Sequence, residues 1–151
     1  MSNTIKLKNY SDVFEEYTST AVAITPGHLI QVTSAGLVEK HSTANGFVLP
    51  MFAIEDELQG NGIDDAYAIS SKIQCWVPGR GDIVNAILAD EENVAIGNFL
   101  CSNAAGELKK LDATTSAGDV PNPIGIALAA LNLSSSSAAA VADTRIAVRI
   151  I

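Results

Sequence analysis

Hydrophobic and polar residues alternate along much of this chain, with the period of two that is typical of β-strands. The pattern is clearest at residues 144–151, where every second side chain is expected to face inward. The inward set is Ile146, Val148 and Ile150, and the outward set is Arg145, Ala147 and Arg149. Apolar runs separated by turn residues predict further strands earlier in the chain. They cover residues 21–25, 29–33, 37–40, 47–55, 66–70, 72–77, 82–88, 99–103, 107–111 and 123–131.

Residues 82–88 also fit a short helix, because Val84, Ile87 and Leu88 have helical spacing and Asp82 suits an N-cap. We favour a strand, since the run is short and both of its flanks are predicted strands.

The chain contains the same unit twice. Gly27 aligns with Gly97 at an offset of 70 residues, and the turn residues around Gly36 align with those around Gly106 at the same offset. Later matches have an offset of 73, which a three-residue insertion explains. These matches are Pro50 on Pro123, Leu58 on Leu131, Ile73 on Ile146, Cys75 on Val148 and Val77 on Ile150. The repeat therefore covers about residues 21–77 and 92–151.

The predicted fold is all-β, a compact barrel-like or sandwich-like domain built from a duplicated hairpin unit at residues 19–151. Residues 1–18 lie outside the repeat and are expected to form an extended N-terminal arm. Tyr10, Phe14 and Tyr17 are concentrated there. Aromatic residues are enriched in interface cores, so a partner-docking arm is one interpretation, and a frayed terminus is the other.

Trp76 is the other candidate interface residue. The alternation places it on the opposite face from Ile73 and Cys75, and its counterpart in the second repeat is Arg149. Trp and Arg are both favoured as interface anchors, so Trp76 and Arg149 are predicted contact residues. A loop of the same chain covering Trp76 is the alternative.

Bulk composition narrows the function classes. The 151 residues are 48% hydrophobic and carry a net charge of −8, so the chain can bury a core but is a poor ligand for nucleic acid. No apolar stretch is long enough for a membrane helix, and no signal peptide is expected. Cys75 and Cys101 are expected to be reduced thiols in a cytosolic setting.

The sequence offers no complete catalytic or metal-binding pattern, so no enzyme activity, metal or cofactor is expected. His28 and His41 are expected to be exposed surface residues. The acidic runs at residues 55–57, 64–65 and 90–92 are expected to be solvated, with a calcium site as the alternative. The Gly-rich turn at residues 78–82 lacks the Lys and Ser or Thr of a phosphate-binding loop.

The order of motifs in the second half resembles tailed-bacteriophage head decoration (capsid cement) proteins. The resemblance starts at Pro78-Gly79-Arg80-Gly81-Asp82 and continues through residues 83–100. It includes residues 106–110, 123–130 and 145–151, and it extends over most of residues 20–151. The separate motifs are general β signals, and their series carries the likeness.

The resemblance implies a structural protein without a catalytic site. It implies attachment to the outside of an icosahedral head as a homo-trimer, with the major capsid protein as partner. The protein would be made in the host cytoplasm and located on the virion exterior. Residues 1–18 match, by position, the segment that reaches over the capsid in such proteins.

Other functions remain as alternatives. One is another phage structural module, such as a tail, spike or fibre base, which also uses duplicated β units. A second is a trimeric β-rich nucleotide hydrolase in which Asp82 and Asn85 bind metal and phosphate, although the sequence lacks its second acidic motif. A third is a ligand-binding barrel, which would need a polar cavity rather than dense apolar faces.

Overall fold

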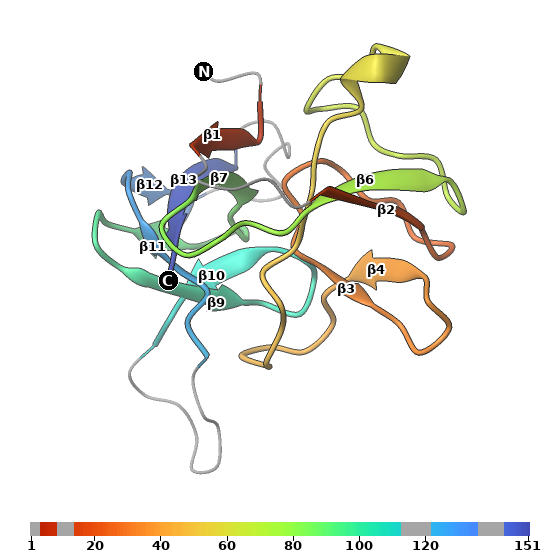
Figure 1. Ribbon diagram of the computed structural model, residues 1–151. Coiled ribbons are helices and arrows are strands. Elements are labelled where there is room, and N and C mark those ends of the chain that lie inside the picture. The colour runs from red at the N-terminus through yellow and green to blue at the C-terminus, as the bar shows by residue number, and fades with distance from the viewer. Residues whose placement is uncertain (1–3, 9–13, 113–121, 136–143) are drawn as a thin grey trace.

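The computed structural model describes residues 4–8, 14–112, 122–135 and 144–151. This part of the chain is all-β, as predicted, and its one helical element is the 3-10 turn η1 (Glu57–Gln59). The strands form open sheets of antiparallel pairs (Figure 1). They are β1 (Lys6–Lys8), β2 (Phe14–Thr18), β3 (Ile30–Val32), β4 (Val38–Lys40), β5 (Phe52–Ala53), β6 (Lys72–Trp76), β7 (Ile83–Ile87), β8 (Asn93–Val94), β9 (Phe99–Ser102), β10 (Leu108–Lys110), β11 (Gly125–Ala127), β12 (Leu131–Asn132) and β13 (Arg145–Ile150).

Two sets of strands, one in each half of the chain, are arranged in the same order. In copy one, residues 14–76, the order is β2-β6-β5-β3-β4, with the bridge between Leu29 and Phe52 joining β5 to β3. In copy two, residues 83–150, the order is β7-β13-β11-β9-β10. Figure 1 shows copy one on the right and copy two on the left. β1 adds one further strand to the outer edge of β7.

The two hairpins of the repeat share one register. β3 pairs with β4 as β9 pairs with β10, so that Val32 lies opposite Val38 and Ser102 lies opposite Leu108. Gly36 and Gly106 both have a φ of 73° in the connecting turns. Glycine adopts this left-handed conformation without strain, which explains why it occurs in both turns.

The repeat begins earlier than the sequence indicated. β2 pairs with β6 in the register in which β7 pairs with β13: Phe14 opposite Trp76 corresponds to Ile83 opposite Arg149. The expectation that residues 1–18 lie outside the repeat is therefore wrong for β2. The two strands need different side chains, because β2 is largely exposed whereas β7 is a buried strand between β1 and β13. Their sequences consequently show no similarity.

Two of the predicted alignments are also wrong. Ala53 opposite Cys75 corresponds to Ala127 opposite Val148, which gives β5 and β11 an offset of 74 residues. Pro50 therefore does not align with Pro123. The sequence could not reveal this, because the connection before β11 changes length by an amount that only the strand pairing fixes.

Leu58 and Leu131 are not equivalent either. Leu58 lies in η1 and is 95% exposed, whereas Leu131 pairs with Val94. In copy one, the residue equivalent to Val94 is Ile24, and its partner is Tyr67. Copy one therefore has its long connection before this pairing, and copy two has its long connection after it.

The core consists of two clusters that meet at β6. Ile73 and Cys75 belong to the cluster inside copy one. Trp76 belongs to the larger cluster, which also contains Leu29, Phe52 and the core of copy two. The predicted alternation along β6 is confirmed, but both faces of this strand are covered, so the expectation of an outward Trp76 is wrong. One continuous apolar cluster thus joins the two copies.

The two cysteines are free and buried, as expected for reduced thiols. Burial raises the pKa of the Cys75 thiol to about 12, so this thiol stays protonated at neutral pH. Within the ranges that the structure describes, no helix is long and apolar enough to cross a membrane.

Candidate functional site

The residues predicted to form a contact surface do not lie on one surface. Phe14 and Tyr17 are three positions apart on β2, so their side chains point to opposite faces of the strand. Phe14 lies opposite Trp76 and is 44% exposed, whereas Tyr17 packs against the cluster inside copy one. Tyr10 lies outside the described residues. Phe14 is therefore the member of the aromatic group that the structure shows accessible to a partner.

Tyr17 is held by a local hydrogen bond. Its hydroxyl donates to the carboxylate of Glu15 on the same strand. This hydrogen bond, followed by burial and by the negative charge of Glu15, raises the pKa of Tyr17 above its usual range. Tyr17 therefore contributes to the packing of β2 as well as to its surface.

Trp76 is fully buried and cannot act as a surface anchor in this fold. It lies opposite Phe14 on one side and Phe52 on the other. Its indole Nε1 has no hydrogen-bond partner among the described residues. Of the two interpretations of Trp76, coverage by the protein's own chain is the one observed.

Arg149, the counterpart of Trp76, is exposed on β13. It lies opposite Ile83 and Ile126 in copy two. The position that is buried in copy one is thus open to solvent in copy two. Arg149 remains available for a contact, on a different copy from Phe14.

The expectation of exposed histidines is wrong for both residues. His28 and His41 are each only 2% exposed. The Thr25 amide donates to Nδ1 of His28 at 3.0 Å, and Nδ1 of His41 lies 2.6 Å from the Ser102 hydroxyl oxygen. This burial could not be predicted from the sequence, because both residues are covered by contacts between the two copies.

Asp82 and Asn85, which were considered as ligands in a hydrolase, are both buried in the fold. Asp82 is fully buried, and its carboxylate accepts a hydrogen bond from the Gly79 amide at 2.7 Å. Asn85 is 7% exposed in the middle of β7, which confirms the strand interpretation of residues 82–88. Among the described residues, no group of three or more His, Cys, Asp or Glu side chains is placed to hold a metal ion.

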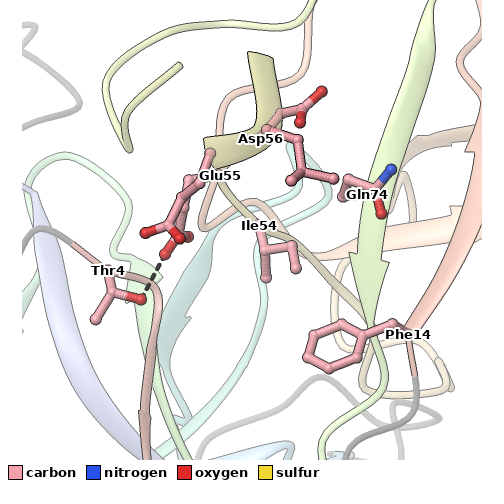
Figure 2. A pocket seen from close by; sticks show the side chains of 8 residues that line it. Thr4, Phe14, Ile54, Glu55, Asp56 and Gln74 are labelled. Carbon is pink, nitrogen blue, oxygen red and sulfur yellow. Dashed lines mark hydrogen bonds between the residues drawn. The ribbon is translucent and has the colours of Figure 1, made fainter. Parts of the chain in front are cut away.

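A pocket of about 300 Å³ lies between β2, β6 and the segment that enters η1 (Figure 2). Phe14, Ile54 and Leu58 form its apolar part. Its polar lining consists of Thr4, Glu55, Asp56, Glu57 and Gln74. Figure 2 shows the Thr4 hydroxyl donating to Glu55, whose other carboxylate oxygen accepts from the Ile5 amide at 3.2 Å. These bonds tie the N-terminal segment to the pocket.

The pocket combines an apolar floor with an acidic rim. Phe14 and Leu58 expose 44% and 95% of their surface, and three consecutive acidic residues, Glu55, Asp56 and Glu57, line the same pocket. This chemistry suits a protein segment with basic and apolar side chains. The sequence analysis did not predict an exposed Leu58, although an apolar residue between Glu57 and Gln59 in a polar loop is a usable signal.

A second groove, of about 370 Å³, lies along β3. Val32, Phe47 and Leu49 line it and are 48%, 81% and 62% exposed. Exposed apolar side chains gathered in one groove are typical of a protein contact. Sequence reasoning missed this groove as well, because it assigned Phe47 and Leu49 to a buried strand.

Comparison with solved structures finds a chain of similar fold. No model of a known protein family matches the sequence, and no curated protein matches it. Among solved structures, the chain is similar to the head fiber gp8.5 N base of bacteriophage phi29, with a TM-score of 0.54 and 11% sequence identity. The similarity covers 92% of this chain and 95% of the phi29 chain. At this identity the likeness establishes the fold.

Proposed function

We propose that this chain is a structural virion protein that binds the outer surface of an icosahedral phage head and stabilises the capsid without enzymatic activity. The observation that carries the proposal is the fold likeness to a phage head fibre base over nearly the full length of both chains. The sequence resemblance to head decoration proteins supports the same class. Many equivalent attachment sites on a shell let modest individual contacts add up.

The pocket beside β2 is the surface we propose for head binding. It is the place where Phe14, a residue expected to contact the capsid, is accessible. Leu58 extends the same apolar area, and the acidic rim provides charge complementarity to basic residues of the major capsid protein. Tyr10 and residues 1–3 of the proposed arm stay part of the proposal by their position in the sequence.

Co-sedimentation with undecorated heads tests the proposal. We expect the wild-type chain to sediment with the heads, and the double variant Phe14→Ser/Leu58→Ser to bind at least about 30-fold more weakly, since central apolar anchors contribute about 2 kcal/mol or more each. Val22→Ser, which removes a 46% exposed apolar side chain elsewhere, should bind like the wild type. Loss of thermal stability by the double variant would be checked by circular dichroism.

Wild-type protein that stays in the supernatant with heads of its own phage would refute head binding. Normal binding by the double variant would instead refute the pocket as the contact surface. The homo-trimer expected from the resemblance is part of the proposal and is measured by light scattering of the same preparation.

A fibre base is the second candidate, and the fold likeness to the phi29 head fiber base favours it. A decoration protein and a fibre base differ in what projects from the head. Negative-stain images of particles labelled with antibody against this chain distinguish the two, because a fibre base marks the root of a filament. Intact-mass analysis of the protein from purified particles gives the length of the natural chain.

A further inference from the structure

The two copies contact each other through different surfaces. Copy one contributes the turn around Gly27 and the start of β3, which form its turn face: Pro26, Gly27, Leu29 and His41. Copy two contributes β7, β13 and its hairpin, which form its strand face: Asn85, Ile87, Ser102, Gly106 and Arg145. The contact is heterologous, so each copy retains the face that the other one uses.

Backbone hydrogen bonds fix this intrachain contact. The Ile87 amide donates to the Gly27 oxygen at 3.1 Å, and the Leu29 amide donates to the Gly106 oxygen at 2.7 Å. Nη2 of Arg145 donates to the Pro26 oxygen at 3.1 Å. A Cβ at Gly106 would lie 3.0 Å from the Leu29 oxygen and 2.9 Å from Cβ of Lys40. The two surfaces therefore fit at close range.

The unused turn face of copy two is open and apolar. Its residues are the counterparts of the copy-one turn face at the offset of 70: Ile96, Gly97, Phe99 and Leu111. Ile96 is 69% exposed and Phe99 is 47% exposed, whereas the equivalent Leu29 is fully buried. A Cβ at Gly97 would meet no described atom within 4 Å. Arg149 is exposed on the same copy, at the position where copy one buries Trp76.

The unused strand face of copy one is open as well. Its residues are Glu16, Thr18, Val32, Gly36 and Lys72, the counterparts of the copy-two strand face in the matched strand pairs. Val32 is 48% exposed, whereas the equivalent Ser102 is fully buried. A Cβ at Gly36 would meet no described atom within 4 Å. The apolar groove along β3 continues this face.

At one pair of equivalent positions, the two unused faces carry apolar residues where the two used faces carry polar ones. Within the chain, His41 of the turn face is hydrogen-bonded to Ser102 of the strand face at 2.6 Å. The counterparts of this pair are Leu111 and Val32, so that a polar pair in one contact corresponds to an apolar pair in the other. Apolar residues on both sides are what a contact between separate chains requires.

We propose that the turn face of copy two binds the strand face of copy one in a second molecule of this chain, repeating the intrachain contact. In this arrangement the Thr18 amide donates to the Gly97 oxygen of the next molecule, and the Phe99 amide donates to the Gly36 oxygen. The Lys72 side chain donates to the backbone oxygen of Ile96 in the next molecule, as Arg145 donates to the backbone oxygen of Pro26 within the chain. Head-to-tail contacts of this kind close into a ring or continue as a filament. The proposal goes beyond head binding and does not depend on it.

Size-exclusion chromatography with light scattering tests the proposal on the full chain. We expect the wild type to have a mass of at least twice the 15.7 kDa of one chain. Val32→Asp and Phe99→Asp, on opposite faces, should each weaken association at least about 30-fold, as expected for central apolar anchors. Leu58→Asp, a matched substitution outside both faces, should leave the mass unchanged. Circular dichroism confirms that the variants are folded.

Mixing the two variants separates a head-to-tail contact from a two-fold one. A Phe99→Asp chain keeps its strand face, and a Val32→Asp chain keeps its turn face. An equimolar mixture should therefore form a 1:1 dimer and nothing larger. The proposal is overturned if the wild type is a monomer at all concentrations, if either variant associates normally, or if the mixture stays monomeric. Leu58→Asp that assembles but does not sediment with heads shows that assembly and head binding are separate.

Discussion

Equivalent residues in the two copies show how burial alone changes the chemistry of a side chain. Nδ1 of His28 accepts a hydrogen bond from the Thr25 amide at 3.0 Å, and Oδ1 of Asn98 accepts one from the Ala95 amide at 2.9 Å. The turn is the same, but His28 is covered by copy two. Burial first, and then the positive charge of Lys40, lower the pKa of His28 to about 4. His28 is therefore neutral in the folded protein at neutral pH.

His28 makes stability depend on pH in a defined window. The folded-state pKa of about 4 is below the ordinary value of 6.5, so the unfolded chain binds the proton first as the pH falls. The contribution of neutral His28 to the free energy of unfolding is complete above pH 6.5. It is lost as the pH falls from 6.5 to 4, and the loss is about 3 kcal/mol. Urea unfolding at pH 7 and pH 4.5 measures this effect. Between these two pH values, the free energy of unfolding should fall less for His28→Asn than for the wild type. Asn98→His, at the open position, is the control and should add little pH dependence.

Residue burial was the property that the sequence predicted least well. Arg145 was expected to face outward, yet its side chain is 3% exposed and its Nη1 lies 2.6 Å from a carboxylate oxygen of Asp64. The alternation of β13 is correct, but at Arg145 the face opposite the core is covered by a loop of copy one, whereas Arg149 on the same face is exposed. Period-two patterns report which side chains share a face, and they do not report what another part of the chain places over that face.

At the scale of elements, the hairpins could be predicted, whereas the equivalence of β2 and β7 could not. The two hairpins carry Gly at the same turn position, a local requirement that both copies must meet. β2 and β7 have no such shared local requirement, because one is exposed and the other is central in its sheet. The candidate surfaces were hidden for the same reason. Phe99 resembles a core residue, since its counterpart Leu29 is one.

The equivalent glycines provide a matched test of the contact between copies. Gly36 and Gly106 share a φ of 73°, so replacement by Ala strains both turns equally. Only at Gly106 would the new Cβ lie within 3.0 Å of neighbouring atoms. In the Phe99→Asp background, which is expected to prevent self-association, Gly106→Ala should lower the free energy of unfolding by about 1–3 kcal/mol more than Gly36→Ala. Equal effects in chemical denaturation would contradict the described packing.

At the scale of the whole molecule, the larger of the two apolar clusters contains residues of both copies. Leu29, Phe52 and Trp76 of copy one belong to the cluster that contains the core of copy two. Burial of large side chains at such a junction couples the two parts, because opening one part exposes apolar surface of the other. The molecule is therefore expected to unfold as one unit rather than as two lobes.

Trp76 is a natural probe of this coupling, since it is the single tryptophan of the sequence. In the Phe99→Asp background, tryptophan fluorescence and far-ultraviolet circular dichroism should give coincident urea transitions with equal midpoints. Phe52→Ala should shift both transitions together and destabilise the fold by about 3–5 kcal/mol. Two separate transitions would show that the copies fold independently.

The matching strand order of the copies also affects how the chain emerges during synthesis. β2 and β7 occupy equivalent places, so each is a potential partner for either β6 or β13. All strands of copy one have been synthesised by Trp76, before β7 leaves the ribosome, so β2 can pair with β6 before a competitor is available. When β13 appears, β6 already has a partner, and the late strand adds to β7. We therefore expect translation from the N-terminus to reduce strand exchange between the two halves of the fold.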